Sequence, residues 1–349
     1  MKLYNLGHVR WEYSQLIYHA LPRLGMEGLV LLSPATPYAC IGYHQDVNQE
    51  IDLEFCRQRG IPVFRREVGG GAVYLDGRQL FYQIILGRDH PLATLDKATL
   101  YQRMLEPVAQ CYGDLGIPCR YKPVNDVVTL AGRKISGTGA AEIANSVVVV
   151  GNLIFDFDYE TMVRVLRVPD EKYRDKVYKS LTENLTTIQR ELGYVPAEEE
   201  AIAFLVRRYE AVLGKLEPAP LPAEVMMKAD ELRPQFTSEA WLHARGRRPA
   251  DGRDVKIATG VHIVQRLRKV PGGLVRATLE LRDNVIESAS ITGDFFFYPE
   301  RALAELEERL AGAALAEVDA VIAAFYRERK IDSPGLTPAD LAAILRGAE

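Results

Sequence analysis

Apolar residues recur along the first two thirds of the chain with two periods, and each period predicts its own kind of element. Spacings of three and four residues predict amphipathic helices over residues 11–24, 50–59, 98–115, 159–166 and 198–213. Short apolar runs bounded by glycine, proline or polar residues predict strands. The most apolar run, 146–155, contains four consecutive valines and is typical of a buried strand. Further strands are predicted over residues 29–32, 39–42, 61–64, 72–75, 80–86, 126–130 and 134–142.

The last third of the chain follows a different order of elements. Three prolines within residues 216–222 indicate a boundary. Beyond it, three predicted strands precede three predicted helices, which is typical of a small α+β domain. We therefore predict a catalytic domain over 1–222, a linker over 223–253 and an accessory domain over 254–349. The strands are predicted over 254–267, 273–281 and 285–292, and the helices over 299–310, 315–326 and 338–346.

The stretch 169–180 differs from its surroundings in composition. It is dense in charged residues and poor in large aliphatic ones, so it cannot bury much apolar surface. This composition predicts a mobile surface loop.

Charge and cysteine content exclude several classes of protein. A net charge of −4 argues against a dedicated nucleic-acid binder. The four cysteines contain no CxxC pair, so neither a zinc site nor an iron–sulfur site is predicted, and free thiols are expected. No stretch reaches the roughly 18 to 20 apolar residues of a membrane span, and the N-terminal residues lack the apolar core of a signal peptide. We therefore expect a cytoplasmic protein.

A first candidate site lies where Gly69, Gly70 and Gly71 follow Arg65 and Arg66. Three residues without Cβ atoms let backbone N–H groups approach a ligand and permit positive φ. The adjacent arginines can supply charge for a carboxylate or a phosphate. A glycine-rich bulge beside a solvated arginine pair explains these residues equally well.

A second candidate site combines Asn125 and Asp126 with a run that contains Lys134, Gly137 and Thr138. The run has neither the GxxxxGK[ST] order of a P-loop nor the third glycine of a dinucleotide fingerprint. A lysine at the start of a strand can still place its ammonium over phosphates, and glycines let the backbone run close to a nucleotide. A hairpin strand with an exposed lysine is the alternative.

Together, these segments resemble the lipoate–protein ligase family, within the wider biotin/lipoate ligase and octanoyltransferase superfamily. The resemblance rests on the order RR, GGGAV, ND and GRKISGTGA, with a preceding IGYHQ and a following SLTENLTT. In the last third, the sequence GDFF after three strands resembles the family's accessory domain. The resemblance implies an α+β fold, in which a mixed-sheet catalytic domain is joined to a smaller α+β domain. It also implies ATP-dependent activation of lipoate to lipoyl-AMP and transfer of the lipoyl group to a lysine of an acceptor protein.

The resemblance also implies roles for single residues. Lys134 matches the catalytic lysine, which bridges the lipoyl carbonyl and the α-phosphate. Lipoate and lipoyl-AMP are expected to contact Lys134 together with Arg66, Gly69, Gly70 and Gly71. Val68 and Leu75 stand where many members have Ser or Thr and His, and both changes make the expected acyl site more apolar.

The nucleotide is expected at Asn125, Asp126, Gly137 and Thr138, with Mg²⁺ on Asp126. The stretch 169–180 matches the adenylate-binding loop. ATP, Mg²⁺ and lipoate or octanoate are thus the expected small molecules, without a stably bound prosthetic group. The expected partner of this monomer is an apo lipoyl domain or a glycine-cleavage H-type carrier, with neither nucleic acid nor membrane involved.

The main alternative is an octanoyl or lipoyl transferase of the same fold, which needs no ATP. Such an enzyme would use Cys119 as a thioester nucleophile. If Cys119 lies on a strand, Arg120 and Lys122 point to the opposite face and do not directly lower its pKa. The GRGRxGR-like loop of biotin–protein ligases is absent. A non-catalytic binding module of the same fold would not need Lys134.

Overall fold

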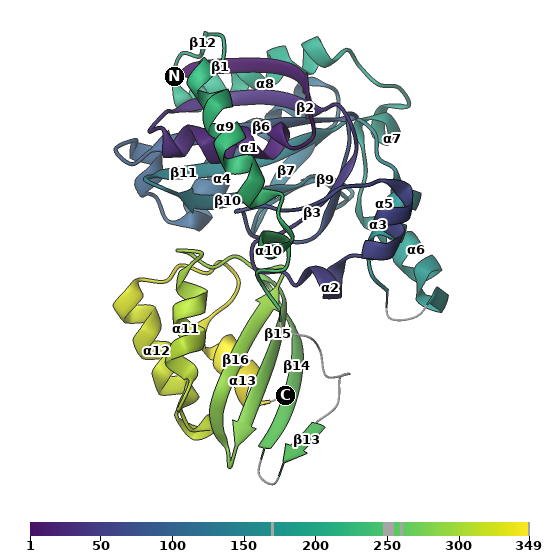
Figure 1. Cartoon of the computed structure of the whole chain (residues 1–349). Helices are drawn as coiled ribbons and strands as arrows, with labels where there is room; N and C mark the ends of the chain where they lie inside the picture. Colours follow the sequence, from purple (N-terminus) through teal and green to yellow (C-terminus); the bar gives the residue numbers. More distant parts are fainter. Residues whose placement is uncertain (169–170, 247–254, 259–260, 348–349) are drawn as a thin grey trace. The chain divides into compact units, whose positions relative to one another are not determined.

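The computed structural model describes residues 1–168, 171–246, 255–258 and 261–347, which form two compact units (Figure 1). The division differs from the expected one, because residues 223–241 belong to the first unit and two short segments before residue 73 belong to the second. The first unit comprises Met1–Cys40, Ile51–Glu67 and Val73–Trp241, and the second comprises Ile41–Glu50, Val68–Ala72 and Leu242–Glu349.

A six-stranded sheet forms the centre of the first unit, in the order β10-β11-β6-β2-β1-β12. The predicted valine-rich strand is β11 (Ser146–Ile154), which runs antiparallel to β6 (Gln79–Gly87). The pair β1 (Lys2–Val9) and β2 (Gly28–Pro34) is parallel, so the expectation of a mixed sheet is confirmed. The remaining strands of this sheet are β10 (Thr138–Ile143) and β12 (Glu217–Pro218).

Helices cover both faces of this sheet. On one face lies α1 (Tyr13–Arg23), where the Ser14 carbonyl accepts a hydrogen bond from Gln83 of β6. Successive strand residues point to opposite faces, and on the other face Tyr82 packs against Tyr209 of α8 (Glu198–Leu213). The helix α8 also packs on α4 (Lys97–Asp114). None of the described helices is long and apolar enough to cross a membrane.

The helix α9 (Ala223–Phe236) occupies part of the expected linker, 223–253. Its buried residues are Val225, Ala229, Leu232 and Phe236, a helical stripe that packs against α1. Because this stripe is buried, residues 223–236 belong to the first unit rather than to a linker. Residues 247–253 of the expected linker lie outside the described residues.

Two small three-stranded sheets complete the first unit. One has the order β4-β3-β5, with β4 (Val63–Arg65), β3 (Tyr38–Ile41) and β5 (Val73–Leu75). The other has the order β7-β8-β9, with β7 (Cys119–Lys122), β8 (Asp126–Thr129) and β9 (Lys134–Ser136). The shorter helices are α3 (Leu53–Arg59), η1 (Pro91–Thr94), α5 (Tyr159–Val165), α7 (Ile188–Leu192) and α10 (Glu239–Leu242).

The charged stretch expected to be a loop is largely helical. Residues Glu171–Tyr173 form η2, and Arg174–Asn184 form α6. No residue of α6 is buried, and Lys179 and Glu183 pair at 3.9 Å one turn apart. The prediction of a loop was wrong because charged side chains at helical spacing support a solvated helix without any apolar stripe.

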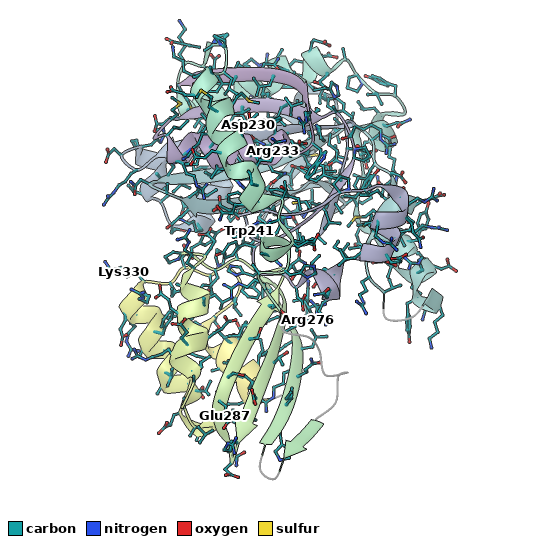
Figure 2. The ribbon with its side chains drawn as sticks, viewed as in Figure 1. Asp230, Arg233, Trp241, Arg276, Glu287 and Lys330 are labelled. Atoms are coloured by element: carbon teal, nitrogen blue, oxygen red, sulfur yellow. The ribbon has the colours of Figure 1, made fainter. Side chains whose placement is uncertain are left out.

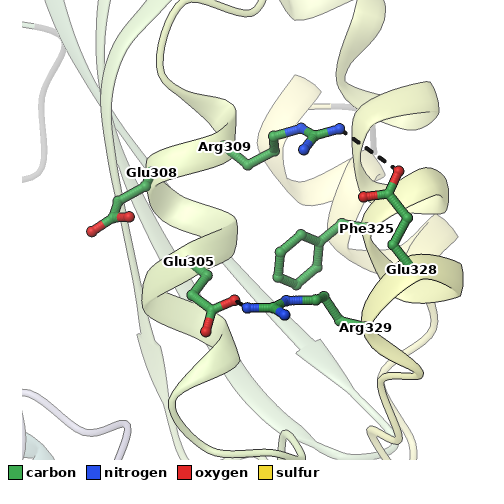
Figure 3. Close-up of a pocket in the computed structure, with 6 residues that line it drawn as sticks. All are labelled: Glu305, Glu308, Arg309, Phe325, Glu328 and Arg329. Carbon is green, nitrogen blue, oxygen red and sulfur yellow. Dashed lines mark hydrogen bonds and ion pairs between the residues drawn. The ribbon is translucent and has the colours of Figure 1, made fainter.

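The second unit contains α2 (Val47–Glu50) and a four-stranded antiparallel sheet, β13-β14-β15-β16. Along β15 buried and partly exposed residues alternate, as expected for a sheet covered on one face. Across the helices, Arg329 pairs with Glu305, and Arg309 pairs with Glu328 at 3.7 Å, beside the buried Phe325 (Figure 3). The elements are β13 (Val255–Ala258), β14 (Val261–Val270), β15 (Gly273–Arg282), β16 (Val285–Gly293), α11 (Ala302–Leu310), η3 (Leu315–Glu317), α12 (Val318–Arg329) and α13 (Pro338–Arg346).

Candidate functional site

Lys134 and Asp126 meet on the small sheet β7-β8-β9. Lys134 begins β9, and its ammonium lies 2.5 Å from the Oδ1 atom of Asp126 at the start of β8. The side chains are 38% and 28% exposed, so water reaches both. An ion pair of this kind contributes about 1 kcal/mol or less to stability, and an incoming anion can replace the carboxylate at little cost. The Lys134 ammonium is therefore placed where an anionic ligand can bind it in place of the Asp126 carboxylate.

The backbone of Lys134 is fixed from a distant part of the sequence. The N–H group of Thr186 donates to the Lys134 carbonyl at 2.8 Å, and Leu185 forms a parallel β-bridge with Lys134. Thr186 belongs to the SLTENLTT segment. That segment therefore holds the strand end from which the Lys134 side chain projects.

The predicted nucleotide residues also come together in the first unit. The side-chain amide of Asn125 donates to the Thr138 carbonyl at 2.5 Å. The Thr138 hydroxyl lies 3.2 Å from the hydroxyl of Tyr82, whose pKa burial raises to about 12. The phenol therefore stays protonated and can donate. Asn125, Asp126, Lys134 and Thr138 thus lie within one small region of the fold.

Gly137 contributes space rather than a free donor. Its N–H group donates to the side-chain oxygen of Asn152 at 2.9 Å. A Cβ atom at Gly137 would have only that oxygen within 4 Å, at 3.6 Å, so a ligand can approach the Cα atom closely. The space beside the Gly137 Cα atom is therefore open.

The two arginines before the glycine loop have different environments. Arg65 is 1% exposed, its Nε atom donates to the Trp241 carbonyl at 3.0 Å, and the Trp241 indole donates to the Arg65 carbonyl at 2.8 Å. Figure 2 labels Trp241, which ends the first unit. Arg66 instead lies beside Cys40, with its Nη1 atom 3.5 Å from the Cys40 carbonyl. Arg65 is therefore structural, and Arg66 remains the candidate for binding.

The glycine loop belongs to the second unit. Gly70 has a φ of +90°, and a Cβ atom at Gly42 would lie 1.9 Å from the Gly70 carbonyl oxygen. A Cβ atom at Gly69 would lie 3.0 Å from the ring of Phe296. Backbone thus packs on backbone here, so these glycines are required by close approach. The motifs IGYHQ, GGG and GDFF therefore meet within one unit, which their distances along the sequence did not predict.

Cys119 and the Lys134 ammonium lie on opposite faces of the small sheet. Cys119 is opposite Thr129, so both side chains point to one face, while Asp126 is on the other because strand residues alternate. The Lys134 ammonium contacts Asp126 and therefore shares its face. Burial, with a smaller contribution from the charge of Glu191, raises the pKa of the Cys119 thiol to about 12. A thiol in this state is a poor nucleophile at neutral pH.

A magnesium ion fits the site only together with a nucleotide. No group of three or more His, Cys, Asp or Glu side chains that could hold a metal occurs among the residues the structure describes. Mg²⁺ in nucleotide sites is typically held by one or two carboxylates, phosphate oxygens and water. The partly exposed carboxylate of Asp126 satisfies the protein's share of such a site.

Comparison with known proteins agrees with this arrangement. Residues 7–210 match the lipoyl protein ligase A/B catalytic domain, and residues 262–345 match the bacterial lipoate protein ligase C-terminus. The chain belongs to the lipoyl protein ligase A/B family. The resemblance seen in the sequence is thereby confirmed, and so is the α+β fold with a second, smaller domain.

Relatives within the lipoyl protein ligase A/B family include both ligases and transferases. The chain is 28% identical to the lipoate-protein ligase LplJ of Bacillus subtilis over 280 residues, which are 79% of this chain and 78% of LplJ. It is 24% identical to the octanoyltransferase LipM of Kyrpidia tusciae over 232 residues, which are 60% of this chain and 84% of LipM.

Two solved structures share the fold. LipL1 of P. falciparum in complex with lipoate matches with a TM-score of 0.68 at 12% identity, over 99% of this chain and 98% of LipL1. A bi-partite lipoate protein ligase from Thermoplasma acidophilum, described with its E2 lipoyl domain, matches with a TM-score of 0.62 at 24% identity, over 71% of this chain and 98% of that one. Family membership therefore leaves the choice between ligase and transferase to the site.

Proposed function

We propose that this protein is a lipoate–protein ligase that activates lipoate with ATP and transfers the lipoyl group to a lysine of an acceptor protein. The observation that supports this choice is the ion pair of Lys134 with Asp126, on the face of the small sheet opposite Cys119. A ligase needs a cation at the reacting phosphate, which Lys134 can provide. A transferase needs a reactive thiol, and burial suppresses the thiolate of Cys119.

The reaction has two steps. In the first, a carboxylate oxygen of lipoate attacks the α-phosphorus of ATP, the bond to the β,γ-pyrophosphate breaks, and lipoyl-AMP and pyrophosphate form. In the second, the neutral ε-amine of the acceptor lysine attacks the lipoyl carbonyl, the bond to AMP breaks, and an amide forms with loss of a proton. The mixed anhydride is needed because a carboxylate is a poor acyl donor.

Lys134 is the residue proposed to act in the first step. When the nucleotide binds, the ammonium exchanges the Asp126 carboxylate for an α-phosphate oxygen and the lipoyl carboxyl group. Negative charge develops on these oxygens as phosphorus is attacked, and a fixed cation stabilises that charge preferentially. Asp126 would then hold the magnesium ion of ATP, which would neutralise phosphate charge.

The other predicted residues provide binding in this proposal. Asn125, Gly137 and Thr138 are proposed to bind the nucleotide, and Arg66, Gly69, Gly70 and Gly71 are proposed to bind the acyl group. The helix α6 takes the place of the expected adenylate-binding loop. Because none of its residues is buried, it can move toward a bound adenylate without breaking a packed core. The acceptor is proposed to be a lipoyl domain, as the likeness to the Thermoplasma acidophilum ligase suggests.

The alternative function is an octanoyl or lipoyl transferase with Cys119 as the nucleophile, and it is favoured by the LipM relatives. The transferase reaction would not require ATP, and the acyl group would come from a thioester.

The half-reaction without acceptor separates the two functions. Purified protein is mixed with ATP, Mg²⁺ and lipoate, and lipoate-dependent exchange of labelled pyrophosphate into ATP is followed. The ligase predicts exchange in the wild type and undiminished exchange in Cys119→Ala. Absence of exchange, together with acyl transfer from octanoyl thioester that Cys119→Ala abolishes, would establish the transferase instead.

A further inference from the structure

Two buried amide side chains connect strand β5 to the turn between β9 and β10. The Asn152 amide on β11 accepts a hydrogen bond from the N–H group of Gly137 at 2.9 Å and donates to the Gln79 side-chain oxygen at 2.8 Å. The Gln79 amide on β6 in turn donates to the Tyr74 carbonyl at 3.2 Å. Gln79 is 1% exposed and Asn152 is 8% exposed. The result is a continuous chain of hydrogen bonds across three strands.

Backbone groups at both ends fix which atoms donate and which accept along this series of hydrogen bonds. The Gly137 N–H can only donate, so the oxygen of the Asn152 amide must face it and the nitrogen must face Gln79. The Tyr74 carbonyl can only accept, so the nitrogen of the Gln79 amide must face it. Both amides therefore have a single satisfactory orientation, which makes the chain of bonds rigid.

Asn152 forms two further hydrogen bonds, through its backbone, with Ser136 and Gly137. Its carbonyl accepts a hydrogen bond from the Ser136 hydroxyl at 2.6 Å, and its N–H group donates to the Gly137 carbonyl at 3.3 Å. Asn152 thus forms three hydrogen bonds with Ser136 and Gly137. These two residues separate Lys134 and Ile135 from Thr138, so their position sets the distance between the proposed catalytic lysine and the nucleotide side.

The two amides are polar groups within largely aliphatic strands. They satisfy the Gly137 N–H group and the Tyr74 carbonyl, both of which an apolar pair of similar size would leave without these bonds. The surrounding strands β6 and β11 are largely aliphatic, with Leu80, Ile84, Val148 and Val149 fully buried or nearly so.

We infer that Gln79 and Asn152 are positioning residues for the adenylation step, which rests on the proposed function. They hold Ser136 and Gly137 so that Lys134 and Thr138 face the same nucleotide. Through Tyr74 they tie this turn to β5, the strand that directly follows the glycine loop in the sequence. The turn between Lys134 and Thr138 is thereby linked to β5 within the first unit.

The test compares two glutamines on the same face of β6. Gln79 and Gln83 are four residues apart, both are 1% exposed, and Gln83 donates to the Ser14 carbonyl, away from the turn. We expect Gln79→Ala and Asn152→Ala to lower kcat/KM for ATP in pyrophosphate exchange by about 10- to 100-fold, the loss typical of reacting groups displaced by about 1 Å. Gln83→Ala should stay within about threefold of the wild type. The double variant should be little worse than Asn152→Ala, because both remove one chain of bonds.

A conservative replacement separates positioning from folding. In Gln79→Glu, a neutral carboxyl group can donate to the Tyr74 carbonyl and accept from Asn152, while a carboxylate cannot donate. Activity of Gln79→Glu relative to the wild type should therefore rise as the pH falls. All variants are compared at a temperature where circular dichroism shows them folded.

Several outcomes would overturn the inference. A folded Gln79→Ala variant with wild-type kcat and KM would contradict the positioning role. A loss of kcat/KM in Gln83→Ala equal to that in Gln79→Ala would also contradict it. If these occur while the wild type exchanges pyrophosphate, the proposed function survives and the positioning role does not. If the wild-type protein shows no ATP-dependent pyrophosphate exchange, both the proposed function and the positioning role are contradicted.

Discussion

Replacing Lys134 with alanine removes the cation at the start of β9 and leaves the Asp126 carboxylate in place. The structure predicts different sizes for the effects on stability and on catalysis. Both partners of the ion pair are partly exposed, at 38% and 28%, so its loss should cost about 1 kcal/mol of unfolding free energy or less. The folded protein should therefore survive the change.

The catalytic effect should be much larger. At about 4 Å and an effective dielectric constant of about 20, a unit charge pair is worth about 4 kcal/mol. Because each 1.36 kcal/mol corresponds to a factor of ten in rate, the adenylation rate should fall about 1,000-fold. Only the part of this energy that is gained in the transition state speeds the reaction, so this figure is an upper limit.

The neighbouring lysine of the same sheet provides a matched control. Lys122 on β7 is directly opposite Asp126 and exposed, but the Asp126 carboxylate pairs with Lys134. Single-turnover formation of lipoyl-AMP is measured in Lys134→Ala and Lys122→Ala, with urea unfolding of each. Lys122→Ala should remain within about threefold of the wild type. A folded Lys134→Ala that keeps more than a tenth of the wild-type rate, or an equal loss in Lys122→Ala, would refute the assigned role.

Substitutions at Cys119, His19 and Gly42 should have distinct effects. Cys119→Ser should keep ATP-dependent activity. Alkylation of Cys119 at pH 8 should be slow because the pKa of its thiol is raised to about 12, and rapid inactivation by iodoacetamide would contradict this. His19 is buried, and burial lowers its pKa to about 4. Between pH 6.5 and 4, His19 is therefore protonated in the unfolded chain but largely neutral in the folded one, which lowers the free energy of unfolding. Urea unfolding should show a stability loss of about 3 kcal/mol between pH 6.5 and 4, absent in His19→Phe; an unchanged pH dependence in that variant would contradict it. Gly42→Ala should displace the Gly70 carbonyl and abolish measurable activity, and wild-type kinetics in that variant would show that the loop tolerates the shift.

Four residues predicted from the sequence to share one site lie close together in the structure. Antiparallel pairing of β8 with β9 and the bond from Asn125 to Thr138 bring Asn125 and Asp126 near Lys134 and Thr138, and the roles of these residues stay predictions. Short-range pairing of this kind follows from glycine-punctuated hairpins, whose turns are visible in the sequence.

Other features depend on long-range packing and could not be predicted from local patterns. Arg65 and Arg66 look alike in the sequence, yet the bond to Trp241, 176 residues away, buries the first. The roles of Tyr82 and Gln79 come from contacts with residues 56 and 73 positions away. A polar residue inside an aliphatic strand, as Asn152 is in β11, was the available signal for such a role.

The helix α9 could have been predicted from the sequence. Its apolar residues recur at intervals of four, three and four, a helical stripe that the nearby prolines obscured. The membership of the glycine loop in the second unit was not predictable, because it depends on a close approach of Gly42 to Gly70 and on packing of Gly69 against Phe296.

The central claim is that acyl transfer by this protein consumes ATP through Lys134. The most direct test incubates the protein with an apo lipoyl domain and lipoate, with and without Mg-ATP, and follows the acceptor mass and AMP together. The proposed ligase should add one lipoyl group per acceptor and release one AMP per transfer, with no product without ATP or with Lys134→Ala. Acceptor modification from an octanoyl thioester without ATP, lost in Cys119→Ala and kept in Lys134→Ala, would contradict it.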